Sequence, residues 1–218
     1  MNDLPDCPLC SGIPIPFHVD GERQFFQCPG CSLVFLRPDQ RLTPLQEVLR
    51  YCDHRNSADD AGYVEFLSRL AEPLRARLTQ GARGLDYGCG PAPVLAAMLT
   101  ASGYPTDSYD PFFMGDESVH DKAYDFVSCS EVIEHVHDPR AFLERLRSIV
   151  RGGGLIALMT RFYGHDTPFP GWWYHRDPTH VCFYNRETMN WIAESFGWGL
   201  EIPAPNVAIF TVPAARAP

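Results

Sequence analysis

The sequence predicts an α/β fold in which a doubly wound sheet follows a small cysteine-rich module and a helical connector. Three observations support this prediction. Two C-x2-C pairs stand near the N-terminus, apolar residues recur at helical spacing between residues 39 and 80, and from Gly84 onward short apolar strands alternate with helices. We therefore expect three parts, covering residues 1–38, 39–80 and 81–218.

Composition limits the classes of partner. The chain of 218 residues has a formal net charge of −9, from 18 basic and 27 acidic residues. This balance weighs against a nucleic-acid partner, which usually meets a basic face, and it favours a cationic ligand. No apolar run reaches the ~20 residues that span a bilayer, and the N-terminus lacks a basic-then-apolar signal. We expect a cytoplasmic protein that does not bind membranes, while its oligomeric state is left open.

The first part reads as a zinc ribbon. Cys7 and Cys10 are separated by 17 residues from Cys28 and Cys31, a spacing typical of four thiolates around a structural zinc ion. The intervening "FHVDGERQFFQ" has a D-G turn between strand-like residues, which predicts a hairpin. Chance turns or two disulfides are the alternatives. We favour zinc, because the other four cysteines are scattered singly. Four thiolates leave no open position for catalysis.

Residues 39–80 form the predicted connector. Apolar residues at helical spacing predict two helices, and Thr43 followed by Pro44 is a typical start for the first. The polar stretch "DHRNSADDAG" separates them. We assign no chemistry to this part, although the second helix is expected to cover the mouth of the following ligand site.

The third part alternates strands and helices. "GLDYG", "TDSYD", "DFVSC" and "LIALMT" read as strands, the last one entered through "GGG". "VLAAMLTAS" reads as a helix ending near Gly103. Asp138 and Pro139 begin a second helix, and "RETMNWIAESFG" is a third one closed by Gly197. This order predicts a parallel sheet with helices on both faces and a ligand at the carboxyl ends of the strands.

The turn after the first of these strands resembles a nucleotide-binding loop. Gly88 and Gly90 match the first two glycines of G-x-G-x-x-G, but Pro93 occupies the third position. Asp110 follows Gly90 by 20 residues, where a carboxylate accepts ribose hydroxyls. Asp86, before the turn, suits a positively charged ligand better than a pyrophosphate. After Asp110, the residues Pro111, Phe112 and Phe113 offer an apolar wall for a base.

Taken together, "LDYGCGPAP", "YDPFF" and "YDFVSCSEVIEHVHDP" resemble class I methyltransferases that use S-adenosylmethionine, which have a Rossmann-like fold. The resemblance covers about residues 81–213. It implies that the glycine loop approaches the methionine end of the cofactor, that Asp110 binds the ribose, and that Ser130 lies beside the cofactor. The family's third glycine is Ala92 here. The segment between Phe113 and Tyr124 is short, so the third strand is expected to be reduced or missing.

The hexapeptide "SEVIEH" places Glu131, Glu134 and His135 at i, i+3 and i+4, on one face if the segment is helical. Some methyltransferases with E-x-x-E-H at this place bind a divalent metal with a further histidine, for which His180 is available. We favour the interpretation without a metal, in which Glu131 borders the cofactor and Glu134 ties down the helix.

The long segment before the last helix is expected to lie over the active site. Trp172, Trp173 and Tyr174 are expected either to pack this loop or to form an aromatic wall. Related methyltransferases carry a histidine followed by an aromatic residue where His180 stands, often near the methyl acceptor. Asp177 is expected to orient that histidine or to cap a turn. We expect His180, and after it His135, to act as the base.

The favoured function is a methyltransferase with a small-molecule acceptor, S-adenosylmethionine as cofactor and a structural zinc ion. Bacterial methyltransferases with a ribbon of this kind ahead of the domain have a similar layout, and some modify deoxysugars. The alternatives are a zinc-ribbon methyltransferase acting on ribosomal or transfer RNA, and a non-catalytic binding module with a relic cofactor pocket. Intact Gly88, Gly90 and Asp110 argue against a relic.

Overall fold

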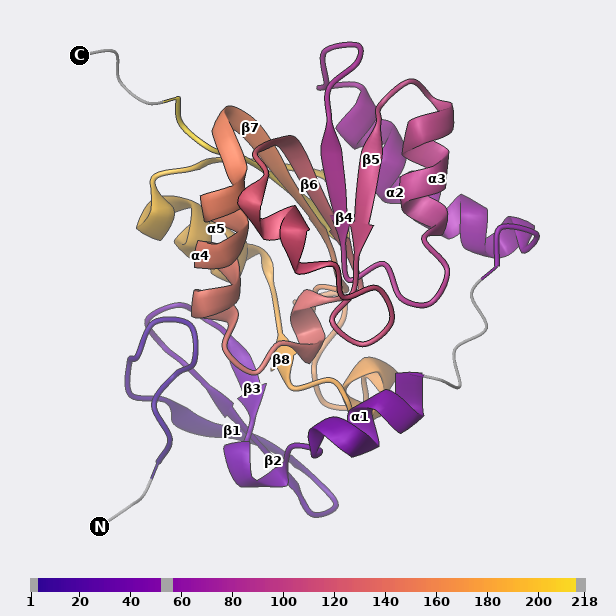
Figure 1. The fold of residues 1–218 in the computed structure, drawn as a ribbon. Coiled ribbons are helices and arrows are strands. Elements are labelled where there is room, and N and C mark those ends of the chain that lie inside the picture. The colour runs from indigo at the N-terminus through magenta and orange to yellow at the C-terminus, as the bar shows by residue number, and fades with distance from the viewer. Residues whose placement is uncertain (1–3, 52–56, 215–218) are drawn as a thin grey trace.

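The computed structural model describes residues 4–51 and 57–214 and contains two sheets (Figure 1). The N-terminal ribbon, residues 4–37, contributes β1 (Ile15–Asp20), β2 (Arg23–Gln27) and β3 (Val34–Leu36) to a four-stranded antiparallel sheet. Its fourth strand is β8 (Cys182–Phe183), from the far end of the chain, which pairs with β3. The predicted hairpin is therefore present, and a later segment extends its sheet. The division into three parts stays a prediction.

The connector forms helices at both predicted places. The 3-10 helix η1 (Pro38–Gln40) leads into α1 (Pro44–Tyr51), which begins at the predicted proline. After residues 52–56, which lie outside the described part, α2 (Ala61–Arg75) begins with the Asp60 carboxylate accepting hydrogen bonds from two backbone N–H groups of the first turn.

The second sheet has six strands in the order β5-β4-β6-β7-β10-β9. Its first four strands are parallel, and β10 and β9 complete it in antiparallel pairing. The strands are β4 (Gly84–Tyr87), β5 (Thr106–Tyr109), β6 (Tyr124–Ser130), β7 (Val150–Met159), β9 (Gly199–Ala204) and β10 (Val207–Thr211). The glycines expected to precede β7 lie inside it. A 3-10 helix, η2 (Glu117–Asp121), stands where the third strand of the fold was expected to be reduced or missing.

Helices cover both faces of this sheet, as Figure 1 shows. Alternate residues of β7 point to opposite faces. Leu155, Ala157 and Met159 pack with α2 and α3 (Val94–Ala101), whereas Ile156 and Leu158 pack in the core shared with α4 (Pro139–Ile149) and α5 (Arg186–Phe196). Two predicted helix ends are confirmed. The Asp138 carboxylate caps α4, and Gly197 ends α5 in the left-handed conformation, with φ of 66°.

The two remaining 3-10 helices, η3 (Ile133–His135) and η4 (Trp173–Arg176), follow the carboxyl ends of β6 and β7. The core that contains α4 and α5 continues without a break into the buried residues of the N-terminal ribbon. Among the described residues, no helix combines the length and apolar character that crossing a bilayer requires.

Candidate active site

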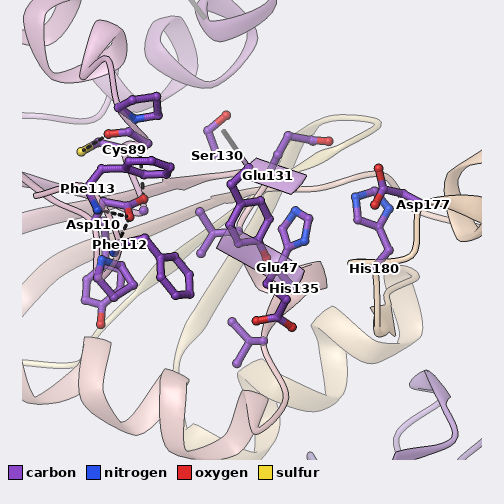
Figure 2. Close-up of a pocket in the computed structure, with 18 of the residues that line it drawn as sticks. Glu47, Cys89, Asp110, Phe112, Phe113, Ser130, Glu131, His135, Asp177 and His180 are labelled. Atoms are coloured by element: carbon purple, nitrogen blue, oxygen red, sulfur yellow. Dashed lines mark hydrogen bonds between the residues drawn. The ribbon is translucent and has the colours of Figure 1, made fainter. Parts of the chain in front are cut away.

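A cavity of about 660 Å³ opens at the carboxyl ends of β4, β5 and β6 (Figure 2). In that view Asp110 with Phe112 and Phe113 lies at one end and His180 at the other, with Glu131 and His135 between them. The predicted site residues that line it are Gly88, Gly90, Asp110, Pro111, Phe112, Ser130, Glu131, His135 and His180. The lining includes four carboxylates, those of Glu47, Asp110, Glu131 and Asp177, and none of the described lining residues is a lysine or an arginine. Asp177 is already paired with Arg50, at 3.1 Å, and the other three carboxylates favour a cation in the cavity.

The glycine loop and Asp110 hold each other in place. Asp110 accepts a hydrogen bond at 2.9 Å from the Gly90 N–H through one carboxylate oxygen, and bonds from the Phe112 and Phe113 N–H groups through the other. Gly88 has φ of 77°, and a Cβ there would lie 2.5 Å from the Val132 side chain, so a larger residue would disturb this turn. The loop is thus fixed across the ends of β4 and β5.

Asp86 lies beneath the cavity and does not line it. Its carboxylate is fully buried in β4 and accepts a hydrogen bond at 3.0 Å from the Ser128 hydroxyl. Burial raises the pKa of Asp86 to about 7, and the Ser128 bond opposes that rise. A positive charge in the cavity would favour the ionised form of this carboxyl.

The expected helical face of "SEVIEH" is wrong. Glu131 adopts the left-handed conformation, with φ of 52°, and only Ile133–His135 form a 3-10 turn. This conformation is unfavourable for a residue with a side chain, and the Glu131 N–H bond to the Met159 carbonyl, at 2.8 Å, helps to hold it. As a result, Glu131 and His135 reach the cavity, while Glu134 is completely buried behind it.

Tyr174 joins the two glutamates. Its hydroxyl lies 3.0 Å from Glu131 Oε2 and also contacts Glu134 Oε1. A phenol has one proton to donate, so in one of these contacts the carboxyl itself must carry a proton. Burial, followed by repulsion from Glu131, raises the pKa of Glu134 well above its ordinary value. We assign the proton to Glu134.

The two predicted bases face each other, with His180 at the end of the cavity opposite Asp110. The imidazole rings of His135 and His180 have centroids 4.7 Å apart. His180 Nδ1 donates to the Tyr174 carbonyl at 2.7 Å, and His135 Nδ1 donates to the Thr179 carbonyl at 3.1 Å. In the neutral rings the lone pair therefore lies on Nε2. Together with Glu134, the two histidines place three ligand atoms within 4.8 Å of one another, as a metal site would require.

The loop that carries His180 uses its aromatic residues in both expected ways. Trp172 is buried and packs against Phe169 and Phe183, whereas Trp173 and Tyr174 line the cavity. Asp177 caps a turn, since its carboxylate accepts hydrogen bonds from the N–H and hydroxyl of Thr179.

The connector contributes to the site, contrary to the expectation that it carries no chemistry. Glu47 and Tyr51 of α1 line the cavity, and so do Tyr63 and Phe66 of α2. Glu47 accepts a hydrogen bond at 2.9 Å from His137, and the Tyr51 ring stands 5.3 Å from the His135 ring. The signal in the sequence was two tyrosines on amphipathic helices. The lining by Tyr63 and Phe66 agrees with the expectation that the second helix covers the site, whereas nothing in the local pattern predicted that α1 also lines it.

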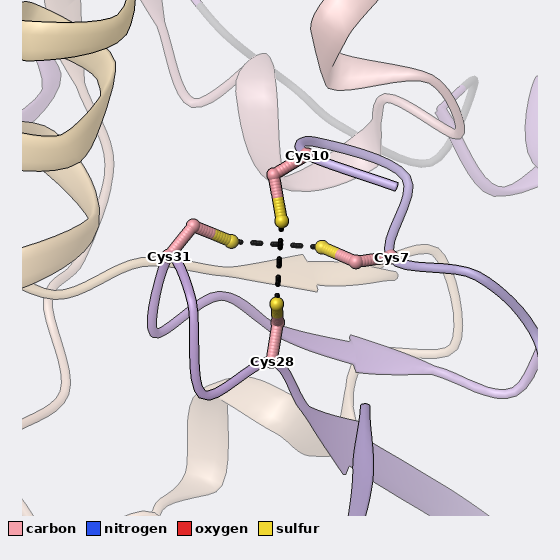
Figure 3. A group of neighbouring side chains, drawn as sticks. All are labelled: Cys7, Cys10, Cys28 and Cys31. Atoms are coloured by element: carbon pink, nitrogen blue, oxygen red, sulfur yellow. Dashed lines mark hydrogen bonds between the residues drawn. The ribbon is translucent and has the colours of Figure 1, made fainter. Parts of the chain in front are cut away.

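The four N-terminal cysteines converge on one point (Figure 3). Their sulfurs lie within 4.8 Å of one another, with Cys7 to Cys31 at 3.5 Å and Cys10 to Cys28 at 3.3 Å. A disulfide requires about 2.0 Å. Four sulfurs at 2.3 Å from a tetrahedral zinc ion stand about 3.8 Å apart, close to these separations. The donor set therefore fits zinc.

Comparisons with known proteins agree with this geometry. A family model described as a methyltransferase domain matches residues 54–201. The ubiquinone biosynthesis O-methyltransferase of Pectobacterium atrosepticum is 32% identical over 91 residues, which cover 42% of this chain and 37% of that protein. That of Klebsiella pneumoniae matches to the same extent. The chain thus spans little more than a third of the length of these curated relatives.

Two solved structures share the fold at low sequence identity. Magnesium protoporphyrin IX methyltransferase from Synechocystis, with bound S-adenosylhomocysteine, gives a TM-score of 0.54 at 14% identity and covers 79% of this chain and 89% of that one. A 1,6-didemethyltoxoflavin N1-methyltransferase from Burkholderia thailandensis gives 0.51 at 14% identity, covering 91% and 99%. Both likenesses concern the arrangement of helices and strands.

Proposed function

The chain belongs to this family of methyltransferase domains, and on that premise we propose that it transfers a methyl group from S-adenosylmethionine to a hydroxyl group of a small, uncharged acceptor. The observation that carries the proposal is a single cavity with a glycine loop and Asp110 at one end and a histidine with a defined tautomer at the other. A nucleoside fits the first end, and a proton acceptor occupies the second.

When bound, the cofactor supplies an electrophilic methyl group on a positively charged sulfur. Asp110 holds the ribose hydroxyls, and Phe112 offers an apolar face to the base. The lining carboxylates stabilise the positive charge before transfer. Methyl transfer requires donor and acceptor in line, so fixing the loop and Asp110 through backbone hydrogen bonds contributes directly to the rate.

His180 is the proposed base. Its Nδ1 proton is committed to the Tyr174 carbonyl, so Nε2 takes the proton of the acceptor hydroxyl as the oxygen attacks the methyl carbon. The products are the methyl ether, S-adenosylhomocysteine and protonated His180, which returns its proton to solvent. His135 lies beside it and helps to orient the acceptor.

The charge of the cavity defines the acceptor class. A carboxylate or phosphate acceptor would meet several carboxylates and, among the described lining residues, no lysine or arginine, which disfavours its binding. The same argument weighs against ribosomal or transfer RNA as the substrate. The ubiquinone-type relatives are named as O-methyltransferases, which supports oxygen as the acceptor atom.

We further propose that Cys7, Cys10, Cys28 and Cys31 hold a structural zinc ion. Glu134, His135 and His180 are assigned hydrogen-bonding and proton-transfer roles without a second metal. Tyr174 already donates within the glutamate pair, and a neutral Glu134 is a weak metal ligand.

Calorimetry with S-adenosylmethionine, followed by a screen of hydroxylated small molecules that detects released S-adenosylhomocysteine, tests the proposal. Saturable binding at one site per chain is expected, with turnover on neutral acceptors. Absence of binding would favour the relic binding module. Turnover with RNA but with none of the small molecules would show that the acceptor is RNA.

A further inference from the structure

The N-terminal ribbon contacts the loop that carries His180, and one of these contacts is made by the side chain of Arg23. Arg23, at the start of β2, is half-buried and donates to three backbone carbonyls of the loop that carries His180. Its Nη2 lies 3.0 Å from the His180 carbonyl, and its Nη1 contacts the His175 carbonyl and lies 3.3 Å from that of Asp177. The guanidinium also stacks on the Phe25 ring, 5.2 Å from its centroid. A planar group with several fixed donors suits three carbonyls at once.

The rest of the ribbon reinforces this contact. Immediately after His180, the Val181 carbonyl accepts from the Leu36 N–H at 2.9 Å, and β8 then pairs with β3. At the beginning of the loop, His175 contacts the Asp20 carboxylate at 3.1 Å. The loop is therefore attached to the ribbon at both of its ends as well as at its centre.

On the opposite side, the loop is attached to the turn that follows β6. The Val181 N–H donates to the Glu134 carbonyl of that turn at 2.8 Å. Within the loop itself, the His180 N–H donates to the Asp177 carbonyl at 3.1 Å. Within this framework the His180 carbonyl is held by Arg23, which sets the peptide plane from which the imidazole projects. A shift of that plane would move Nε2 relative to the acceptor.

We propose that Arg23 is a positioning residue for the methyl transfer, through which the ribbon fixes the location of the His180 imidazole. The proposal rests on the function assigned to His180 above. Arg23 does not line the cavity, so its loss should leave the cofactor end of the site intact. Small displacements of a base reduce the rate far more than they reduce binding.

The test compares Arg23→Ala with Arg37→Ala. Arg37 is an exposed arginine of the same ribbon, and the described contacts of its side chain, to Gln24 and Asp39, stay within residues 23–39. We expect Arg23→Ala to lower kcat about ten- to a hundredfold, with the KM and Kd for S-adenosylmethionine and the metal content unchanged. Arg37→Ala should leave all of these at the level of the unsubstituted chain. Methylguanidinium added at millimolar concentration should restore part of the lost kcat in Arg23→Ala only.

An acceptor-independent readout separates this proposal from the proposed function. Histidine 15N NMR, with the His180 signals assigned through His180→Gln, reports the Nδ1 proton and ring environment directly. Arg23→Ala should shift the His180 signals and leave those of the exposed His165 in place. Unchanged His180 signals, or equal changes in both arginine variants, would overturn the proposal even if the enzyme is active. A shifted signal without any turnover would instead count against the assigned function.

If Arg23→Ala fails to fold, Arg23→Lys provides the second variant. It keeps the positive charge but loses the planar fork, so an intermediate loss of kcat and an intermediate shift of the His180 signals are expected. A folded Arg23→Lys chain with the kcat and spectrum of the unsubstituted protein would also overturn the proposal.

Discussion

Ionisation of Asp86 should couple cofactor binding to pH. This carboxyl is fully buried beneath the glycine loop, and burial raises its pKa to about 7. S-Adenosylmethionine carries a positive sulfur, whereas S-adenosylhomocysteine carries a neutral one and is otherwise alike in its charged groups. If binding of S-adenosylmethionine requires ionised Asp86, chains that hold a proton on Asp86 do not bind it. With a pKa of about 7, this protonated fraction falls from about nine-tenths at pH 6 to about one-tenth at pH 8. The affinity should therefore rise about tenfold over this interval, or about 1.4 kcal/mol.

The assay is calorimetry of both ligands at pH 6, 7 and 8. The ratio of their affinities removes effects that both ligands share. His135, His137 and His180 line the same cavity and could repel a cation when protonated, so Asp86→Asn is the deciding variant. It should abolish the pH dependence of the ratio. Ser128→Ala, which deletes the hydrogen bond that lowers the pKa of Asp86, should move the midpoint to higher pH.

A ratio that stays constant with pH, or that changes equally in Asp86→Asn, would refute the reasoning. Stability gives an independent check. A carboxyl with a raised pKa in the folded chain opposes folding as pH rises from its ordinary value toward about 7, so the free energy of unfolding without ligand should fall over that range. The contribution of Asp86 to this fall should be about 4 kcal/mol at most, and Asp86→Asn should lack that contribution.

Three further predictions concern the base, the buried glutamate and the zinc ion. His180→Ala should lower kcat at least about a hundredfold with little change in the Kd of S-adenosylmethionine. His165→Ala, at an exposed histidine, is the matched control. Equal kcat values for the two variants would exclude His180 as the base. Because burial raises the pKa of Glu134, Glu134→Gln should raise the free energy of unfolding above about pH 4.3, increasingly so toward pH 8. Denaturation at several pH values measures this, and destabilisation throughout the range would contradict it. Elemental analysis should give one zinc per chain, and Cys28→Ser should lose both this zinc and thermal stability. A second divalent ion would assign a metal to Glu134, His135 and His180. Loss of activity to a chelator that leaves the first zinc bound would lead to the same assignment.

Local chemistry made much of this fold predictable. The D-P pair at residues 138 and 139 and the glycine at 197 each satisfy a helix end by a mechanism confined to a few residues, so the sequence pattern alone predicts them. The glycine loop and Asp110 were both predicted to bind the cofactor at the carboxyl ends of the strands. That binding stays a prediction, and the structure brings the two together through the hydrogen bond from Gly90 to Asp110.

The failures all involve contacts between distant segments. Glu131 is not helical, and its N–H donates to the carbonyl of Met159 on the neighbouring strand, a partner that its local sequence does not reveal. The cavity position of Tyr51 depends on how α1 docks, and the role of Arg23 depends on carbonyls more than 150 residues away. Periodicity and capping rules act within one element, so they carry no information about such pairings.

The docking of the ribbon also explains how a closed metal site can matter for a reaction that needs no zinc. A short hairpin buries too little apolar surface to be stable alone, and the zinc ion proposed for the four cysteines would offset that deficit. The ribbon is then rigid enough for β3 to pair with β8 and for Arg23 to hold the His180 loop. Under the proposed roles of Arg23 and His180, the base would depend on a hydrogen-bonded path that begins at the cysteine cluster and runs through backbone groups rather than through the cavity. The ribbon would in this way position a residue of the active site, although none of its own described residues lines the cavity.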